Sequence, residues 1–186
     1  MVKVNIYIDN SNVFGSICDV IKASGDVSWT KMYDPVKLAK ALVGGRKLNK
    51  IYFYCVPPPP WLLDEGEGGV KKHRLASRYY STIEKLPDTE IRWGYLQGNK
   101  DNPLEKNVDT QICSDMVAHA ALSEYDVAIL ASNDGDFTSA IESVRRLGKR
   151  VEVLYFKTYF SNSLKRTADL VRKARRSYFK PIDWGE

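Results

Sequence analysis

The sequence contains little cysteine and little histidine. Its 186 residues include only Cys18, Cys55 and Cys113, and only His73 and His119. An odd number of widely spaced cysteines, with no C-x-x-C pair, argues against a disulfide framework or a zinc site and predicts a reducing, cytoplasmic environment. Two isolated histidines do not assemble a histidine-dependent catalytic triad or a catalytic histidine pair.

The sequence also lacks a long apolar run. No segment approaches the roughly 20 apolar residues that a membrane-spanning helix needs, so no membrane partner is expected. The N-terminus does not resemble a signal peptide, because a single Lys3 precedes a short apolar stretch that Asp9 interrupts. A hydrophobic content of 44% and a charged content of 27% are ordinary for a globular protein. We expect one domain over residues 1–186.

Positive charge is concentrated near the C-terminus. The net charge of the chain is +5, and the segment from 165 to 180 contains a single acidic residue, Asp169. The basic residues of this segment are Lys165, Arg166, Arg172, Lys173, Arg175, Arg176 and Lys180. A basic C-terminal helix and tail, at about residues 162–186, is typical of a contact with a polyanion, and a solvated helix face is the alternative.

Strand-like and helix-like segments alternate along the chain. The pattern predicts strands at residues 3–9, 51–56, 90–96, 127–131 and 151–156. It predicts helices at residues 35–43, about 70–85, about 108–123 and about 136–147, and a last helix that is capped by Ser161 and turns Leu164, Ala168 and Val171 inward. Residues 61–69 and 97–107 are expected to be loops. This alternation favours an α/β three-layer sandwich around a five-stranded, mainly parallel sheet.

Four aspartates stand where a strand gives way to a helix. Asp9 ends the first strand, and Asp134 and Asp136 follow the strand 127–131. Asp109 lies at the start of the helix at about 108–123, which precedes that strand. In an open parallel sheet, the carboxyl ends of the strands meet in one crevice where the strand order reverses. Carboxylates that converge there repel one another unless a hard divalent cation, such as Mg²⁺ or Mn²⁺, lies between them. Taken singly, these aspartates could instead form Asx-turns or helix caps.

Three segments carry motifs in a fixed order. Residues 8–12 read Ile-Asp-Asn-Ser-Asn, residues 106–116 open with Lys-Asn-Val-Asp and hold a second Asp six positions after the first, and residues 131–137 read Ala-Ser-Asn-Asp-Gly-Asp-Phe. Together they resemble the motifs of the NYN family, in particular its LabA-like members, within the PIN-like nuclease superfamily. The similarity continues through residues 147–151 and 164–169. Asn107 stands where the family usually has glycine.

The resemblance implies a PIN-like, Rossmann-like fold with sheet order 3-2-1-4-5. It also implies a metal-dependent endoribonuclease that hydrolyses single-stranded RNA and leaves 5′-phosphate and 3′-hydroxyl ends. The catalytic residues that it implies are Asp9, Asn12, Asp109, Asp134 and Asp136. The four aspartates of this set would bind one or two Mg²⁺ or Mn²⁺ ions.

Further residues are expected to support the site or to contact RNA. Asp115 lies about 240° round its helix from the aspartate that opens it, so we assign it a supporting role, bonded to Asn12 or to a strand backbone group, with a pairing to His119 as the alternative. The other supporting residues are Ser132 and Asn10. The expected RNA contacts are Lys71, Lys72, Arg74, Lys106, Tyr159, Lys165, Arg166, Arg172 and Lys173.

Other classes of function stay open at this point. A non-catalytic RNA-binding or regulatory module could keep the same fold. A phosphatase of the haloacid-dehalogenase type would need Asp where Ser11 stands, and no G-x-G-x-x-G follows the first strand to bind a dinucleotide. The sequence does not decide whether a protein partner or a homodimer is involved.

Overall fold

The computed structural model describes residues 1–24, 32–156 and 161–184, together with the side chains of all of these except residues 18–24. The strands of the central sheet are β1 (Lys3–Asp9), β2 (Lys47–Cys55), β3 (Thr89–Trp93), β6 (Val127–Ala131), β7 (Arg150–Tyr155) and β8 (Leu170–Lys173). Their order is β3-β2-β1-β6-β7-β8, and each neighbouring pair is parallel. Two further strands, β4 (Tyr95–Asn99) and β5 (Asn102–Lys106), form a separate antiparallel hairpin.

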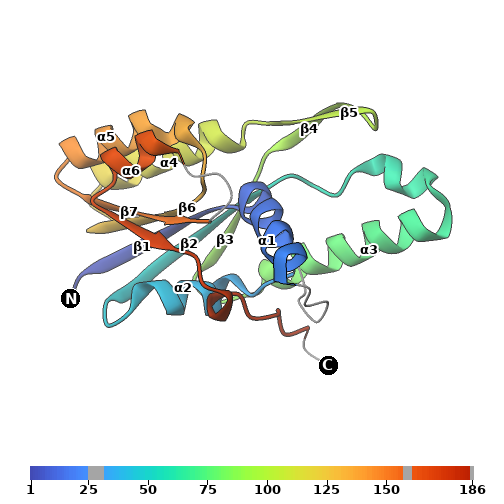
Figure 1. The fold of residues 1–186 in the computed structure, drawn as a ribbon, viewed down its shortest axis with the longest axis horizontal. Coiled ribbons are helices and arrows are strands. Elements are labelled where there is room, and N and C mark those ends of the chain that lie inside the picture. Colours follow the sequence, from blue (N-terminus) through green and yellow to red (C-terminus); the bar gives the residue numbers. More distant parts are fainter. Residues whose placement is uncertain (25–31, 157–160, 185–186) are drawn as a thin grey trace.

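Helices cover both faces of the sheet (Figure 1). They are α1 (Asn10–Ser24), α2 (Pro35–Val43), α3 (Gly66–Ile83), α4 (Val108–Ala121), α5 (Thr138–Arg146) and α6 (Asn162–Thr167), with short 3-10 helices η1 (Pro60–Asp64), η2 (Gly135–Phe137) and η3 (Arg176–Tyr178). Ile6 and Ile8 pack with Leu38 on the face of α1, α2 and α3, whereas Tyr7 packs with Met116 on the face of α4, α5 and α6. Successive strand residues point to opposite faces, so β1 contributes to both cores.

Two predicted helix boundaries are confirmed. The Asp34 carboxylate accepts the backbone N–H groups of Val36 and Lys37 at 2.8 and 3.1 Å, and it caps α2 as expected for an acidic residue before a proline. Gly148 follows α5 with a φ of +78°, a conformation that glycine adopts without strain.

The C-terminal segment differs from the prediction. The last helix follows Ser161, but it ends at Thr167, and residues 170–173 then pair with β7. The backbone N–H of Asp169 donates to the Val151 carbonyl at 2.9 Å, while the Asp169 carboxylate accepts the Val151 N–H at 2.8 Å. These bonds draw the chain alongside β7, so Val171 lies in an edge strand and the sheet has six strands instead of five. The five predicted strands keep their expected relative order within it.

The predicted loop at 97–107 is also wrong. These residues form most of the hairpin, and the predicted strand 90–96 is divided between β3 and β4. The Asn99 side chain accepts the N–H groups of Asp101 and Asn102, each at 3.1 Å, which fixes the hairpin turn. The predicted loop at 61–69 contains most of η1 and the first turn of α3.

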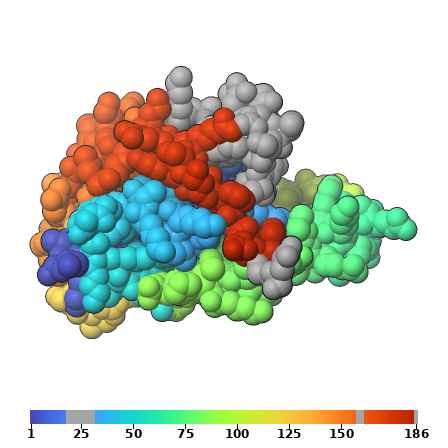
Figure 2. Space-filling model, turned by 90° about the horizontal axis from the view of Figure 1, so that it is seen from below, coloured from blue at the N-terminus to red at the C-terminus, as the bar shows by residue number. Residues whose placement is uncertain are grey.

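After β8 the chain returns to the start of α2. Tyr33 and Pro181 form an isolated antiparallel bridge, and the Asp34 N–H donates to the Lys180 carbonyl at 2.8 Å. The Phe179 ring packs edge-on against Tyr33, with ring centroids 5.5 Å apart. Figure 2 shows this red C-terminal segment lying across the blue helix α2. Residues 179–182 are therefore held against the segment that leads into α2.

In the described part of the chain, none of the helices combines the length and the apolar character that crossing a membrane requires.

Candidate active site

A cleft of about 450 Å³ opens at the carboxyl ends of β1 and β6. Three of the four predicted aspartates line it: Asp9 at the end of β1, Asp109 in the first turn of α4, and Asp134 after β6. The fourth, Asp136, is exposed in η2 next to the cleft. The crevice lies where the chain leaves β1 on one side and β6 on the other, as the topology of an open parallel sheet predicts.

Asp9 is buried, and both of its carboxylate oxygens are hydrogen-bonded. Oδ1 accepts the backbone N–H of Asn12 at 3.2 Å, and Oδ2 accepts the Ser132 hydroxyl at 2.9 Å. Burial raises the pKa of Asp9 to about 7, with smaller contributions in the same direction from the charges of Asp109 and Glu105, although the two hydrogen bonds oppose this shift. A carboxylate held in this way is costly to ionise unless a cation approaches it.

Ser132 connects the acidic residues of the two strands. It is fully buried, and while its hydroxyl donates to Asp9, its oxygen accepts the backbone N–H of Asp134 at 3.2 Å. The Asp134 side chain in turn accepts the N–H of Asp136 at 3.0 Å and caps the turn of η2. The expected supporting role of Ser132 thus has a geometric basis in these two contacts.

Asp109 is brought to the cleft by an unusual residue conformation. Asn107, just before α4, has a φ of +71°. This is the left-handed region, which glycine occupies most easily and asparagine next, so a glycine or an asparagine suits this position. Partial burial raises the pKa of Asp109, followed by the negative charges of Asp134, Asp136 and Glu105. The acidic groups therefore share one electrostatic environment.

The donor set suits a hard divalent cation. Among the residues that the structure describes, no three acidic, histidine or cysteine side chains are already placed to hold one ion directly. The donors around the cleft are nevertheless carboxylate oxygens, which Mg²⁺ and Mn²⁺ prefer. Mg²⁺ usually keeps several of its waters, so carboxylates spread around a cleft of this size can hold it partly through water.

One acidic residue that lines the cleft was not predicted from the sequence. Glu105, in β5, lines the cleft, and its Oε2 accepts the hydroxyl of Ser11 at 2.6 Å. Its charge raises the pKa of both Asp9 and Asp109. Glu105 was not predicted because its segment was expected to be a loop. The only feature of the sequence that could have indicated it is its position next to Lys106, a predicted RNA contact.

Asn133 was also missed, although it holds three segments together. Its backbone N–H donates to Asn12 Oδ1 at 3.0 Å. Its side chain donates to the Ser16 hydroxyl at 3.0 Å and accepts the Phe156 N–H at 2.8 Å. Asn12, expected in the catalytic set, lines the cleft, but its side-chain oxygen is bonded to the turn that leads to Asp134.

Asp115 does not bond Asn12 or His119. Its carboxylate accepts the Tyr54 hydroxyl at 2.8 Å, and Oδ2 lies 3.4 Å from Arg92 Nε. His119 is paired instead with the hydroxyl of Tyr7, at 3.0 Å. Asp115 therefore belongs to a polar network under α4, because its position on the helix turns it toward β2 and β3.

The side chain of Asn10, the first residue of α1, points away from the cleft and toward Tyr33. It is buried, and its side-chain oxygen accepts the Tyr33 hydroxyl at 3.3 Å. This contact holds the start of α1 against the segment before α2. Asn10 is absent from the residues that line the cleft.

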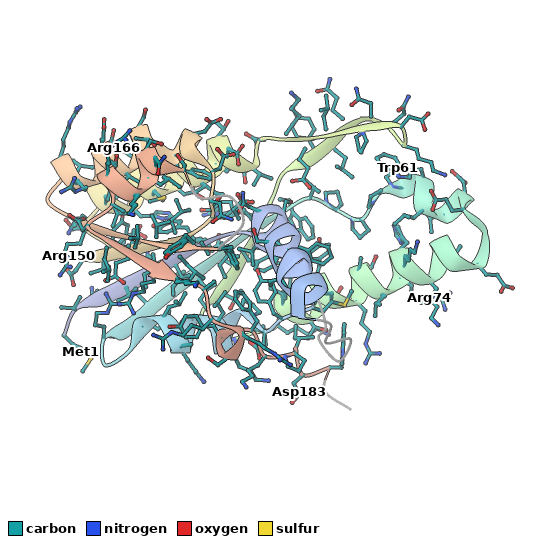
Figure 3. All side chains as sticks on the ribbon, viewed as in Figure 1. Met1, Trp61, Arg74, Arg150, Arg166 and Asp183 are labelled. Carbon is teal, nitrogen blue, oxygen red and sulfur yellow. The ribbon has the colours of Figure 1, made fainter. Side chains whose placement is uncertain are left out.

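The predicted RNA contacts are widely separated. Lys106 lines the cleft. Exposed basic residues lie on α3 (Lys71, Lys72 and Arg74), on α6 (Lys165 and Arg166) and on β8 (Lys173). Figure 3 shows Arg74 and Arg166 at opposite ends of the molecule. Arg172 Nε donates to buried Glu152 at 2.9 Å, so its charge is already paired. Tyr159 lies outside the described residues.

An open parallel sheet with an acidic crevice at the ends of β1 and β6 defines a doubly wound α/β protein. The chain matches the NYN domain over residues 3–174, and it belongs to the NYN domain family. This family has a PIN-like nuclease fold, its members are in general nucleases, and they typically use divalent metals.

A solved structure supports the fold. The chain is similar to a protein of unknown function, VPA0982 from Vibrio parahaemolyticus RIMD 2210633, with a TM-score of 0.64 and 18% identity over 96% of each chain. At this identity the similarity concerns the fold alone. The search of curated proteins found no match.

Proposed function

We propose that this protein is a metal-dependent endoribonuclease of the LabA-like branch of the NYN family and that it hydrolyses single-stranded RNA. The observation that carries the proposal is the convergence of Asp9, Asp109 and Asp134 on one cleft, with their charges coupled to one another. Lys106 is the one basic side chain among the described residues that line it. A concentration of negative charge with so little compensation is suited to a divalent cation.

Asp9, Asp109, Asp134 and Asp136 would hold one or two Mg²⁺ or Mn²⁺ ions. Bound there, such an ion neutralises charge on the scissile phosphate and lowers the pKa of a coordinated water. The exposed position of Asp136 suits a contact through water. Glu105 adds a further carboxylate to this group.

The other residues of the cleft would position these groups and the substrate. Ser132 and the Asn12 N–H fix the orientation of Asp9. Lys106 can bind a phosphate oxygen of the RNA. Attack of water on phosphorus breaks the bond to the 3′ oxygen, which takes up a proton, so the products carry 5′-phosphate and 3′-hydroxyl ends. The choice of RNA over DNA follows from family membership.

We also propose that residues 1–186 act as one NYN domain in the cytoplasm, with the segment at 162–186 as its C-terminal part. The fixed position of residues 179–182 against α2 supports a structural role for that segment in addition to its charge. A protein partner or a homodimer is also compatible with this proposal. The mass of the purified protein in solution would distinguish a monomer from a homodimer.

The test is cleavage of an end-labelled single-stranded RNA in Mg²⁺, in Mn²⁺ and in EDTA. Wild type should cut only with a divalent ion, and Asp134→Asn should lose at least about 100-fold in rate, because such ions contribute several kcal/mol to stabilising the transition state. Asp88→Asn is the matched control. Asp88 is exposed and directly precedes β3, so it lies at the amino ends of the strands, whereas the cleft lies at their carboxyl ends. Its φ of +56° is one that asparagine tolerates.

The alternative function, a non-catalytic RNA-binding or regulatory module, predicts a different result in the same assay. If folded wild type binds RNA but does not cut it in either metal, and binding is unchanged by EDTA or by Asp134→Asn, the protein is an RNA-binding or regulatory module. Products with 5′-hydroxyl ends would contradict the proposed direction of bond cleavage.

A further inference from the structure

A second hollow, of about 510 Å³, lies next to the acidic cleft. It is enclosed by the start of α1, the proline run after β2, η1, α3 and the β4–β5 hairpin. Its main apolar lining residues are Pro57, Pro58, Pro59, Trp61, Tyr80 and Leu96, and we call it the proline–tryptophan groove. Its surface is mainly apolar, in contrast to the cleft. Figure 1 shows the hairpin and the η1–α3 segment both extending beyond the sheet, and Figure 3 shows Trp61 beneath the hairpin in the same view.

The groove and the cleft adjoin each other. Ser11 and Glu105 line both of them, and the hydrogen bond of 2.6 Å between these residues lies at the boundary. A polymer with one phosphate in the cleft would therefore have its neighbouring units at the groove. A small molecule that occupies only one of the two hollows would not need them to adjoin.

An ion pair joins the two elements that project beyond the sheet on either side of the groove. Lys100, at the hairpin tip, forms an ion pair of 2.8 Å with Glu65, just before α3. The hydrogen bond from Lys100, followed by the charges of Lys100 and Lys72, lowers the pKa of Glu65, which places Lys72 near this ion pair. The hairpin is thus tied to the segment before α3, and the apolar groove lies between these two elements and next to the acidic cleft.

The aromatic residues of the groove offer accessible ring surface. Trp61 and Tyr80 are each partly exposed. Tyr80 packs edge-on against Trp93, with ring centroids 5.2 Å apart, and this contact holds its ring in place. Proteins bind unpaired bases by stacking them on such rings, and every base has a face that can stack.

We infer that the proline–tryptophan groove binds unpaired bases of the RNA strand next to the phosphate in the acidic cleft. This inference rests on the proposed nuclease function, because it assigns the neighbouring nucleotides of the same substrate. Bases in a duplex are paired and stacked inside the helix and cannot enter the groove, so the groove selects single strands. A flexible, unpaired segment is the substrate class that fits.

The test is binding, measured in EDTA so that cleavage does not interfere. A fluorescent single-stranded RNA of about ten nucleotides is titrated with protein, and an abasic oligomer of equal length and charge serves as the second probe. Trp61→Ala should weaken binding of the RNA by roughly 5- to 100-fold, the range for loss of stacking on one or two bases. Trp61→Phe, which keeps an aromatic face, should restore most of the affinity. Binding of the abasic oligomer should be weaker and unchanged by Trp61→Ala.

Leu63→Ala is the matched control, because Leu63 lies in the same short helix, is 50% exposed and does not line the groove. It should bind both probes like wild type, and equal thermal unfolding midpoints would show that the variants are folded. A fully paired duplex of the same sequence should bind more weakly than the single strand.

The outcomes separate the groove from the nuclease. If wild type cuts RNA and Trp61→Ala binds and cuts equally well, the groove assignment is overturned and the nuclease stands; an apolar segment of a protein partner would then be its better occupant. If wild type binds but never cuts, while Trp61→Ala loses base-dependent binding, the groove is supported and the nuclease is overturned. Absence of RNA binding both in EDTA and with Mg²⁺ or Mn²⁺ would overturn both.

Discussion

The backbone amide of Asn133 donates to the side-chain oxygen of Asn12 at 3.0 Å, and this bond joins the start of α1, which follows Asp9, to the turn that leads to Asp134. Asn12 follows β1 and Asn133 follows β6, so the bond fixes the distance between Asp9 and Asp134. The cleft is thus organised by neutral hydrogen bonds that hold charged residues near one another.

Asn12→Ala removes this link without touching an acidic residue. We expect kcat for RNA cleavage to fall by about 10- to 100-fold, as for other residues that orient metal ligands, and the free energy of unfolding to fall by about 1 kcal/mol. KM should change little. Steady-state cleavage and urea unfolding measure these effects. A large rise in KM with kcat unchanged would show that Asn12 contacts RNA directly.

Ser132→Ala leaves Asp9 with one hydrogen bond fewer and the Asp134 N–H without its partner. Ser132 is fully buried, so we expect a loss of about 1–3 kcal/mol in the free energy of unfolding. Metal affinity, measured by calorimetry, should also fall. Ser143→Ala is the matched control, because Ser143 is a partly exposed serine of α5 whose hydroxyl donates to Ser139 of the same helix; it should change stability by less than about 0.5 kcal/mol.

The metal-free protein should lose stability as the pH rises toward neutrality. The pKa of Asp9 is about 7 in the folded protein, above its ordinary value of 3.8, so between these values the folded state binds more protons than the unfolded state. The stabilisation is therefore complete below about pH 4 and lost as the pH rises through 7, with a slope of at most about 1.4 kcal/mol per pH unit.

Asp9→Asn should remove most of this dependence. Urea unfolding in EDTA between pH 5 and pH 8 would measure it, and a smaller dependence should remain because the pKa of Asp109 is also raised. Parallel curves for wild type and variant would mean that Asp9 is ionised in the folded protein over the whole range. At pH 7.5, Mg²⁺ or Mn²⁺ should restore the stability of wild type but not of the variant.

Glu152→Gln tests the structural ion pairs apart from the site. Glu152 is buried in β7, and it accepts from Arg46 at 2.7 and 3.1 Å and from Arg172 at 2.9 Å. We expect a loss of about 2–3 kcal/mol, less than for a fully buried pair because both guanidinium groups are partly exposed.

The control for that change is Glu142→Gln, because Glu142 is exposed on α5. It should leave the unfolding midpoint unchanged. Cleavage per folded molecule should stay at the wild-type level in both variants. A loss of activity in folded Glu152→Gln would connect the β7–β8 edge to the site.

The carboxyl ends of β1 and β6 were predictable because both strands are short apolar runs that stop at polar residues. Asp9 and Asp134 then follow from the rule that parallel strands end at the same edge of the sheet. The strand β8 was not predictable in the same way. It is a partly exposed edge strand, and the bonds between Asp169 and Val151 that place it join residues distant in the sequence.

The hairpin shows a second limit of the sequence. Both of its strands are largely exposed, so no alternation of apolar and polar residues marks them, and Gly98, Asn99 and Pro103 are typical of loops. Glu105 and the proline–tryptophan groove depend on this hairpin, so neither could be predicted. Helix α1 was likewise unassigned, although it begins directly after Asp9.

The central position of β1 has a consequence for the synthesis of the chain. Asp9 leaves the ribosome well before β6, which lies beside β1 and leads to Asp134 but is made more than a hundred residues later. The N-terminal strands can pair with one another before then, since chains fold from the N-terminus as they emerge. The acidic cleft cannot form until β6 has been synthesised and has paired with β1. If the protein cleaves RNA as proposed, its nascent chain cannot cleave the messenger that encodes it until β6 has been made.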